Sequence, residues 1–345
     1  MKRFYIFTIS IIYFITGCSS IQLNVVDEKS NVYIAARTEE PAETKAPYVV
    51  TNPKDATLTA LIFASTDNTS YPDNDLDGTQ TGGTIAKHVV AEFQNSEQQL
   101  INGIYYNQNY QTQTAYFTSV YPDTGWIMNS EGQVVTRGFE GKTDLMFAPT
   151  TEGKYGNNPR PTLNFHHLLT YLKIQIGVES ESARDAWGRI TSMTINSRNS
   201  ISINLIDHSV SFSPNEPLDF KFYDPADDTP FVSTDKPYRL QTTLDTDAAY
   251  ILCSPVEATI HDQYDATKRT AEYTIVLSTE QRSNIILDID LKTKDGNTDD
   301  AFFSGTTAGR LFTIGLNFKM GNNIAISTSI TDWETGGTGT GEIEL

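Results

Sequence analysis

Apolar residues occupy every second position in many segments of this chain. In residues 172–178 the apolar side chains of Leu172, Ile174, Ile176 and Val178 alternate with polar or small ones. Neighbouring side chains of a β-strand point to opposite faces of a sheet, so this spacing predicts strands with one buried face. The same alternation recurs at residues 201–205, 218–222, 273–277, 285–291 and 312–318. Turn-forming stretches separate these segments, and we therefore expect an all-β protein built of antiparallel β-sandwiches.

Two alternating segments near the C-terminus are separated by a short turn. Residues 312–318 are followed by the polar and glycine-containing residues 319–323, and a second alternating segment then begins. This arrangement predicts a β-hairpin. The core-facing positions of its last strand are Ile324, Ile326, Thr328 and Ile330.

Helical patterning is scarce. Residues 84–100 are the best candidate, because Thr84 is a suitable cap and Ile85, Val89 and Phe93 share one side of a helix. Residues 87–93 also alternate as a strand does. We expect strand or mixed structure in this segment.

Two changes in composition suggest how the chain is divided. Residues 38–47 form a Glu-, Pro-, Ala-, Lys- and Thr-containing linker, and residues 150–161 are rich in Gly, Asn and Pro. A chain of 345 residues is longer than one hydrophobic core usually serves. We expect two sandwich domains, at residues 48–158 and 159–345, after an N-terminal segment at residues 18–47.

The first residues have the pattern of a lipoprotein signal peptide. Lys2 and Arg3 precede an apolar run at residues 4–15, and the small residues Thr16 and Gly17 lead to Cys18. The run is too short to span a bilayer of about 30 Å. We expect residues 1–17 to be removed and Cys18 to carry the lipid, which would tether the exported protein to a membrane. An ordinary secretory signal, in which Cys18 is incidental, is the alternative.

The net charge of the chain limits the partners that it can be expected to bind. The 25 Lys and Arg residues are outnumbered by 43 Asp and Glu residues, which gives a net charge of -18. Nucleic acid is therefore not an expected partner, because a phosphate backbone requires clustered basic residues.

If Cys18 carries a lipid, Cys253 has no partner for a disulfide. Cys253 follows an apolar strand, and we interpret it as a buried core residue instead of a nucleophile.

One acidic segment has calcium-like spacing. Asp73, Asp75 and Asp77 stand at positions one, three and five of a possible loop, with Gly78 at position six. Position twelve is Thr84 where an EF-hand has a bidentate Glu. A solvated acidic loop tip is the favoured interpretation, and calcium binding is a weak candidate.

No other motif indicates a metal site, a cofactor or a reaction. His166 and His167 are neighbours in a predicted strand and point to opposite faces, and the three remaining histidines stand alone. The chain contains no nucleophile elbow, no phosphate-binding Gly-rich loop and no His-Glu-x-x-His site. We expect neither enzymatic activity nor a cofactor.

Aromatic residues gather in one region. Tyr105, Tyr106, Tyr110, Tyr116, Phe117, Tyr121 and Trp126 lie among Asn, Gln and Thr. Alternating with polar residues in strands, they are best interpreted as core residues. An exposed row of them would instead suit a sugar ring or a host protein.

The order of several motifs resembles the fimbrillin-like family. These motifs are a Tyr-Pro stretch at residues 116–122, Asp-Leu-Met-x-Ala at 144–148, Phe-x-His-x-Leu at 165–169 and Ile-x-x-Trp-x-x-Gly at 330–336. The family comprises lipoprotein pilins and accessory or anchor subunits of Bacteroidales fimbriae. The resemblance implies two transthyretin-like β-sandwiches and a structural subunit of a fimbria at the outer membrane, with other subunits as partners.

The resemblance also implies a route of assembly. In stalk-type members an arginine-directed protease removes the first strand, and a strand from a neighbouring subunit fills the vacated edge. Arg37 is then the expected processing site, and Val32, Ile34 and Ala36 mark the strand that is removed. Lys45 is a weaker alternative site, and a plain surface role for Arg37 remains open.

The strand with Ile324, Ile326, Thr328 and Ile330 either closes its own domain or is donated to a neighbour. The tail after Trp333 is short and rich in Gly and Thr, which keeps tip or accessory roles open beside that of a stalk. The rival function is a monomeric outer-membrane lipoprotein that binds carbohydrate or a host ligand. Such a protein would keep residues 19–37 in place.

Overall fold

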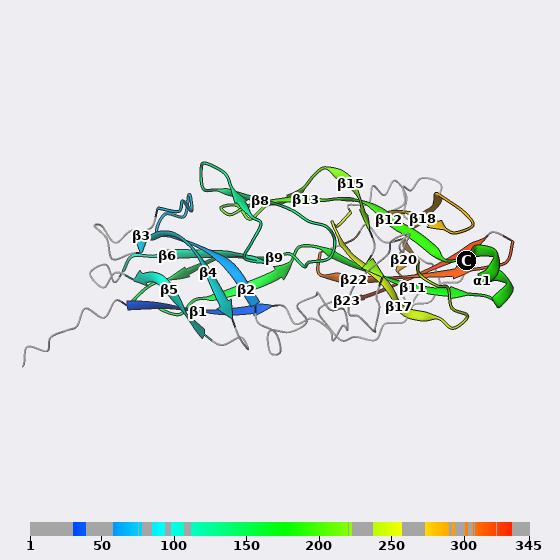
Figure 1. Cartoon of the computed structure of the whole chain (residues 1–345). Helices are drawn as coiled ribbons and strands as arrows, with labels where there is room; N and C mark the ends of the chain where they lie inside the picture. Colours follow the sequence, from blue (N-terminus) through cyan, green and yellow to red (C-terminus); the bar gives the residue numbers. More distant parts are fainter. Residues whose placement is uncertain are drawn as a thin grey trace, which may run out of the picture.

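The computed structural model shows a protein made almost entirely of β-strands, and the all-β expectation is confirmed. It describes residues 30–38, 58–74, 76–77, 85–93, 98–106, 112–219, 221–222, 237–256, 273–289, 292–293, 301–302, 306, 308–321 and 323–332. Within these ranges the one α-helix is α1 (Glu181–Trp187), which begins where the Ser180 side chain accepts a hydrogen bond from the Ala183 N–H. That helix is too short to cross a bilayer, and the described residues contain no other candidate for a membrane-spanning helix. The strands form an elongated molecule (Figure 1).

Eight strands form the sheet at the N-terminal end of the molecule. Their order across the sheet is β3-β4-β2-β6-β9-β10-β1-β5. The pairs are antiparallel except that β1 runs parallel to β10. The segment expected to be strand or mixed contains β4 and the start of β5. The bounds are β1 (Ser30–Thr38), β2 (Leu58–Ser65), β3 (Leu76–Asp77), β4 (Ile85–Phe93), β5 (Gln98–Tyr106), β6 (Ala115–Tyr121), β9 (Met146–Gly153) and β10 (Thr162–His167).

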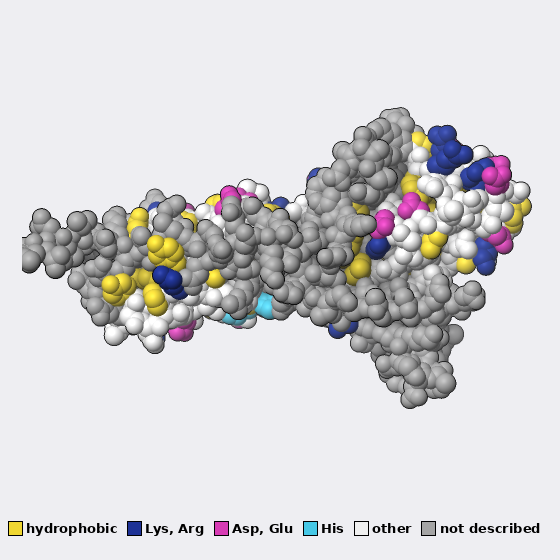
Figure 2. Space-filling view, turned by 90° about the horizontal axis from the view of Figure 1, so that it is seen from below, with side chains coloured by type: hydrophobic (Ala, Val, Ile, Leu, Met, Phe, Trp, Pro, Cys, Tyr) yellow, Lys and Arg dark blue, Asp and Glu magenta, His cyan; other side chains and the backbone are white. Residues whose placement is uncertain are grey.

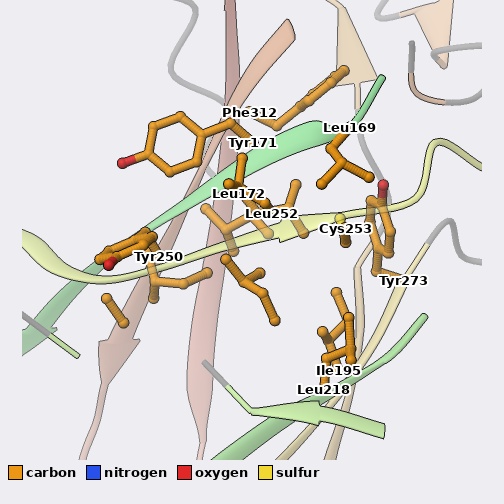
Figure 3. Close-up of a cluster of buried hydrophobic side chains, with 14 of the residues drawn as sticks. Leu169, Tyr171, Leu172, Ile195, Leu218, Tyr250, Leu252, Cys253, Tyr273 and Phe312 are labelled. Atoms are coloured by element: carbon orange, nitrogen blue, oxygen red, sulfur yellow. The ribbon is translucent and has the colours of Figure 1, made fainter. Parts of the chain in front are cut away.

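Two facing sheets form the C-terminal end of the molecule. A five-stranded sheet has the order β16-β17-β11-β22-β23, and a four-stranded sheet has the order β15-β12-β18-β19. Leu172 and Cys253 of the first sheet and Ile195 and Tyr273 of the second contribute to one buried core (Figure 3). The bounds are β11 (Thr170–Val178), β12 (Ile190–Arg198), β15 (Asn215–Asp219), β16 (Lys221–Phe222), β17 (Asp245–Cys253), β18 (Tyr273–Thr279), β19 (Ile285–Ile289), β22 (Arg310–Phe318) and β23 (Ile324–Asp332).

The predicted C-terminal hairpin is confirmed. β22 and β23 are antiparallel along all of β23, from Phe318 opposite Ile324 to Arg310 opposite Asp332. A separate small pair consists of β20 (Lys292–Thr293) and β21 (Ala301–Phe302).

A further sheet joins the two ends of the molecule. It has the order β14-β13-β8-β7, with β7 (Ile127–Met128), β8 (Val134–Gly138), β13 (Ser200–Asn204) and β14 (Val210–Phe212). The Leu205 N–H donates to the Gln133 carbonyl at 2.8 Å, and the Phe139 N–H donates to the Asn199 carbonyl at 2.8 Å. We call β7, β8, β13 and β14 the bridging sheet, because it pairs β8, which lies between β6 and β9 in the sequence, with β13, which follows β12.

The expected boundary at residue 158 falls inside the eight-stranded sheet. The Gly-, Asn- and Pro-rich stretch before it contains a turn in which the Lys154 and Asn158 backbones pair, and this turn lies between β9 and β10. Strand pairing therefore places the change between the two groups of strands after His167. Composition alone does not distinguish a polar turn within a sheet from a linker between domains.

Gly141 packs against β17, and this contact generates a stability prediction. It has a φ of +76°, and a Cβ at this residue would stand 2.6 Å from Ile251 Cγ1 and 3.1 Å from the Leu252 carbonyl oxygen. We expect Gly141→Ala to lower the free energy of unfolding by about 2–4 kcal/mol, through backbone strain and overpacking. Urea denaturation followed by tryptophan fluorescence measures the change.

Gly321→Ala is the matched control. Gly321 has a similar φ of +81°, but a Cβ there would have no atom within 4 Å. This variant should lose only the conformational part, about 1 kcal/mol. Equal losses in the two variants would contradict close packing at Gly141.

Candidate functional site

The strand β1 provides part of the core of the eight-stranded sheet. Val32 and Ile34 are fully buried and Ala36 is 1% exposed. They belong to an apolar cluster that also contains Phe117 of β6 and Phe165 of β10. The alternation in the sequence explains this placement, because residues two apart in a strand face the same way. The three residues expected on the removable strand are thus core residues of the intact chain.

β1 changes partners along its length. Residues 30–35 pair antiparallel with β5, from Ser30 opposite Tyr106 to Ala35 opposite Gln98. Residues 35–38 pair parallel with β10, from Ala35 opposite Thr162 to Thr38 opposite Phe165. Ala35 alone belongs to both registers. β1 therefore joins two strands that are not paired with each other.

Both partners of β1 depend on it for backbone pairing. Among the described strands, β5 pairs with β1 alone. β10 pairs with β9 at His166 and His167, whereas its residues 162–165 pair with β1. Removing β1 would expose an apolar groove between β5 and β10, flanked by backbone N–H and C=O groups without strand partners. Such an edge strongly favours the addition of another strand.

A cation–π contact holds the outer side of β1. The Arg160 guanidinium carbon lies 5.3 Å from the centroid of the Tyr33 ring. Next to it, the Ala35 N–H donates to the Pro161 carbonyl at 3.1 Å. We call the region between β5 and β10, with β1 in it, the β1 groove.

Seen from below, the N-terminal half of the molecule shows hydrophobic side chains next to a Lys or Arg side chain (Figure 2).

The peptide bond after Arg37 lies at the end of β1. The backbone of Arg37 is in register with Asn164, and that of Thr38 with Phe165. The described pairing of β1 with β5 ends at Ala35, and residues 36–38 pair with β10. Cys18 and Lys45 lie outside the described residues.

The other expected exchange strand, β23, is an edge strand of the five-stranded sheet. Ile324 and Ile326 are half-buried, Thr328 is 7% exposed, and the backbone of Ile330 is opposite Phe312. β22 is its paired neighbour over all nine residues. In the structure, β23 is the last strand in the order of its own chain's five-stranded sheet.

The calcium candidate is only partly described. The Asp73 carboxylate accepts a hydrogen bond from the His88 N–H at 3.3 Å and lies 3.9 Å from His88 Nδ1. Asp75 lies outside the described residues, as do the contacts of the Asp77 side chain. Among the residues whose side chains are described, no three His, Cys, Asp or Glu side chains are placed to hold one metal ion. Calcium binding by this loop stays a prediction.

A buried polar pair was missed by sequence reasoning. His167 Nδ1 lies 2.7 Å from Asp144 Oδ2, and both side chains are fully buried. It joins the start of β9 to the end of β10, where the Leu168 N–H also donates to the Leu145 carbonyl at 2.8 Å. The two residues are 23 positions apart, so only the pairing of β9 with β10 reveals that they meet.

The described members of the aromatic cluster do not form an exposed row. Tyr106 and Phe117 are buried and make an edge-to-face contact with centroids 6.3 Å apart. Tyr116 and Trp126 are half-buried, and the Trp126 Nε1–H donates to the Pro122 carbonyl at 2.8 Å. Tyr110 lies outside the described residues.

The chain is similar to a known protein family and to solved structures. The sequence model of the fimbrillin-like family matches residues 44–333. A Bacteroides ovatus protein provisionally assigned to cell adhesion has 12% identity and a TM-score of 0.50, over 88% of this chain and 98% of that one. The fimbrial anchor protein Mfa2 from Porphyromonas gingivalis has 11% identity and a TM-score of 0.37, over 88% and 98% of the two chains. No match was found among curated proteins.

The match to the family model spans most of the chain, and the likeness to the Bacteroides ovatus structure shows a shared fold. The protein is therefore an all-β protein of the fimbrial type. It belongs to the fimbrillin-like family, as the order of its motifs indicated.

The burial of Ile34 generates a prediction about the stability of the β1 groove. We expect Ile34→Ala to lower the free energy of unfolding by about 2–5 kcal/mol, because it leaves a cavity in a fully buried site. Ile286→Ala removes the same atoms from β19, where the side chain is 65% exposed, and should change stability by about 0.5 kcal/mol or less. Chemical denaturation of both variants makes the comparison, and similar losses would contradict the burial of β1.

The environment of Cys253 generates a prediction about reactivity. Its thiol is fully buried beside Tyr273 and donates to the Thr170 carbonyl at 3.7 Å. Burial raises the pKa of this thiol to about 12. Since the thiolate is the reactive form, we expect iodoacetamide at pH 8 to modify Cys253 far more slowly in the folded protein than in urea. The test uses a Cys18→Ser variant, and equal rates would contradict a structural role.

Proposed function

We propose that the protein is a structural subunit of a cell-surface fimbria, assembled by strand exchange after proteolytic removal of its N-terminal segment. The observation that carries the proposal is the placement of β1. Its apolar face is buried in the core, and β5 and the first part of β10 have no other strand partner among the described residues.

The physical reason for assembly is the state of the groove after β1 is lost. Backbone N–H and C=O groups away from water need hydrogen-bond partners, and the apolar cluster around Phe117 and Phe165 would be open to solvent. A strand from a neighbouring subunit restores both the pairing and the burial. Each added subunit thereby completes the fold of the one before it.

The position of Arg37 supports a processing site at this residue. A protease binds its substrate as an extended segment, and residues 36–38 form the last part of β1, where the described pairing is with β10. This end of β1 opens more easily than its centre, because strand ends fray before centres do. Cleavage there would leave Val32, Ile34 and Ala36 on the detached side.

The lipid-carrying precursor gives the subunit its place of assembly. In our proposal Cys18 is lipidated, and the precursor is held at the outer membrane until cleavage after Arg37. The partners are other fimbrial subunits, and a host protein or glycan is a possible ligand of a tip or accessory subunit. The full-length pairing of β23 with β22 supports the closing role of that strand over the donor role.

Two measurements test the proposal. Mass spectrometry of protein sheared from cells should find a mature chain that starts at Thr38. Arg37→Ala should reduce incorporation into fibres at least about tenfold while leaving export intact, because a protease specific for arginine discriminates strongly against a residue that lacks the guanidinium.

Lys45→Ala is the control for this variant. It removes the other basic residue expected as a site and should leave processing and incorporation unchanged. Surface molecules that all begin with lipidated Cys18 would contradict the proposal. They would favour the rival function, a monomeric outer-membrane lipoprotein that binds carbohydrate or a host ligand.

A further inference from the structure

We propose that the cut segment stays in the β1 groove after cleavage and leaves only when an incoming strand displaces it. This inference rests on the proposed function. The retained segment, residues 18–37, would carry the lipid at Cys18. It would therefore hold the processed subunit at the membrane without a covalent bond, and strand exchange would release that subunit at the moment it joins the fibre.

Cleavage removes few of the contacts that hold β1. Hydrolysis of the peptide bond after Arg37 consumes one water molecule and leaves a carboxylate on Arg37 and an amine on Thr38. The pairs from Ser30 to Ala35 with β5, and from Ala35 to Arg37 with β10, all lie on the detached side. The buried side chains of Val32, Ile34 and Ala36 lie there too. Only the pairing of Thr38 stays with the rest of the chain, residues 38–345, which we call the body.

Spontaneous departure of the segment would expose all of these groups at once. The groove would then present the apolar residues of the core and the unpaired backbone of β5 and β10 to water. The outer contact of Tyr33 with Arg160 also opposes departure, since Arg160 belongs to the body. Displacement by another strand avoids this cost, because each lost pair is replaced as it breaks.

The two halves of β1 suggest the order of displacement. Cleavage makes Arg37 a chain end, and chain ends open before strand centres, so residues 36–37 open first and uncover Leu163 and Asn164 of β10. An incoming strand can pair with this part of β10 before the older strand has left. It then advances past Ala35, the residue shared by both registers, and replaces the pairs with β5 last.

The experiment uses full-length lipidated precursor bound to phospholipid vesicles and a protease that cleaves after arginine. Cleavage after Arg37 is followed by mass spectrometry, and flotation separates vesicle-bound from free protein. We expect the body, residues 38–345, to stay with the vesicles after complete cleavage. An excess of a synthetic peptide with the sequence of residues 30–37 should release it, and the same peptide with Ile34→Asp should not.

Two variants check that the β1 groove holds the body. Ile34→Ala should speed spontaneous release about tenfold or more, because it weakens packing at a buried site. Ile286→Ala, at an exposed site on β19, should leave the release rate unchanged. Release of the wild-type body as fast as the bond is cut, with or without peptide, would overturn the inference.

Other outcomes bear on the proposed function separately. A body that is retained and then freed by peptide, yet never adds to fibres, would overturn the fimbrial function while leaving retention intact. Failure of the protease to cut after Arg37 in the vesicle-bound precursor would overturn both. Free body that assembles without ever being retained would overturn retention alone.

Discussion

The N-terminal sheet depends on one strand, β1, which pairs with both β5 and β10. Among the described strands, β5 and residues 162–165 of β10 pair with β1, and the core beneath them takes three apolar side chains from the same strand. All other described strands follow β1 in the sequence, so one cut after Arg37 separates β1 covalently from all of them. A core element that one cut separates in this way can be exchanged without unwinding the rest of the fold.

The two ends of the molecule share a similar strand arrangement, but the length of the strand pairing differs. β22 runs parallel to β11 and antiparallel to β23, as β1 runs parallel to β10 and antiparallel to β5. The β11–β22 register covers Tyr171 to Val178, whereas the β1–β10 register covers Ala35 to Thr38. β22 also has both neighbours along most of its length. The shorter described pairing of β1 supports the proposal that β1, and not β22, is the strand that is exchanged.

The local alternation of apolar and polar residues predicted the strands, but it could not predict which distant strands pair with each other. The alternation of Val32, Ile34 and Ala36 indicated a strand with one apolar face, and the structure buries that face. The turn at residues 319–323 indicated the hairpin. The parallel partner of β1, the bridging sheet and the Asp144–His167 pair depend on which distant segments meet, and alternation carries no information on that choice.

The bridging sheet has a mechanical consequence. Because β8 and β13 are hydrogen-bonded to each other and the cluster that contains Val135 continues into the C-terminal core, the two ends of one molecule cannot rotate independently. In a filament of such molecules, bending would concentrate at the junctions between successive copies. The repeat length would then follow from the span of one rigid protomer.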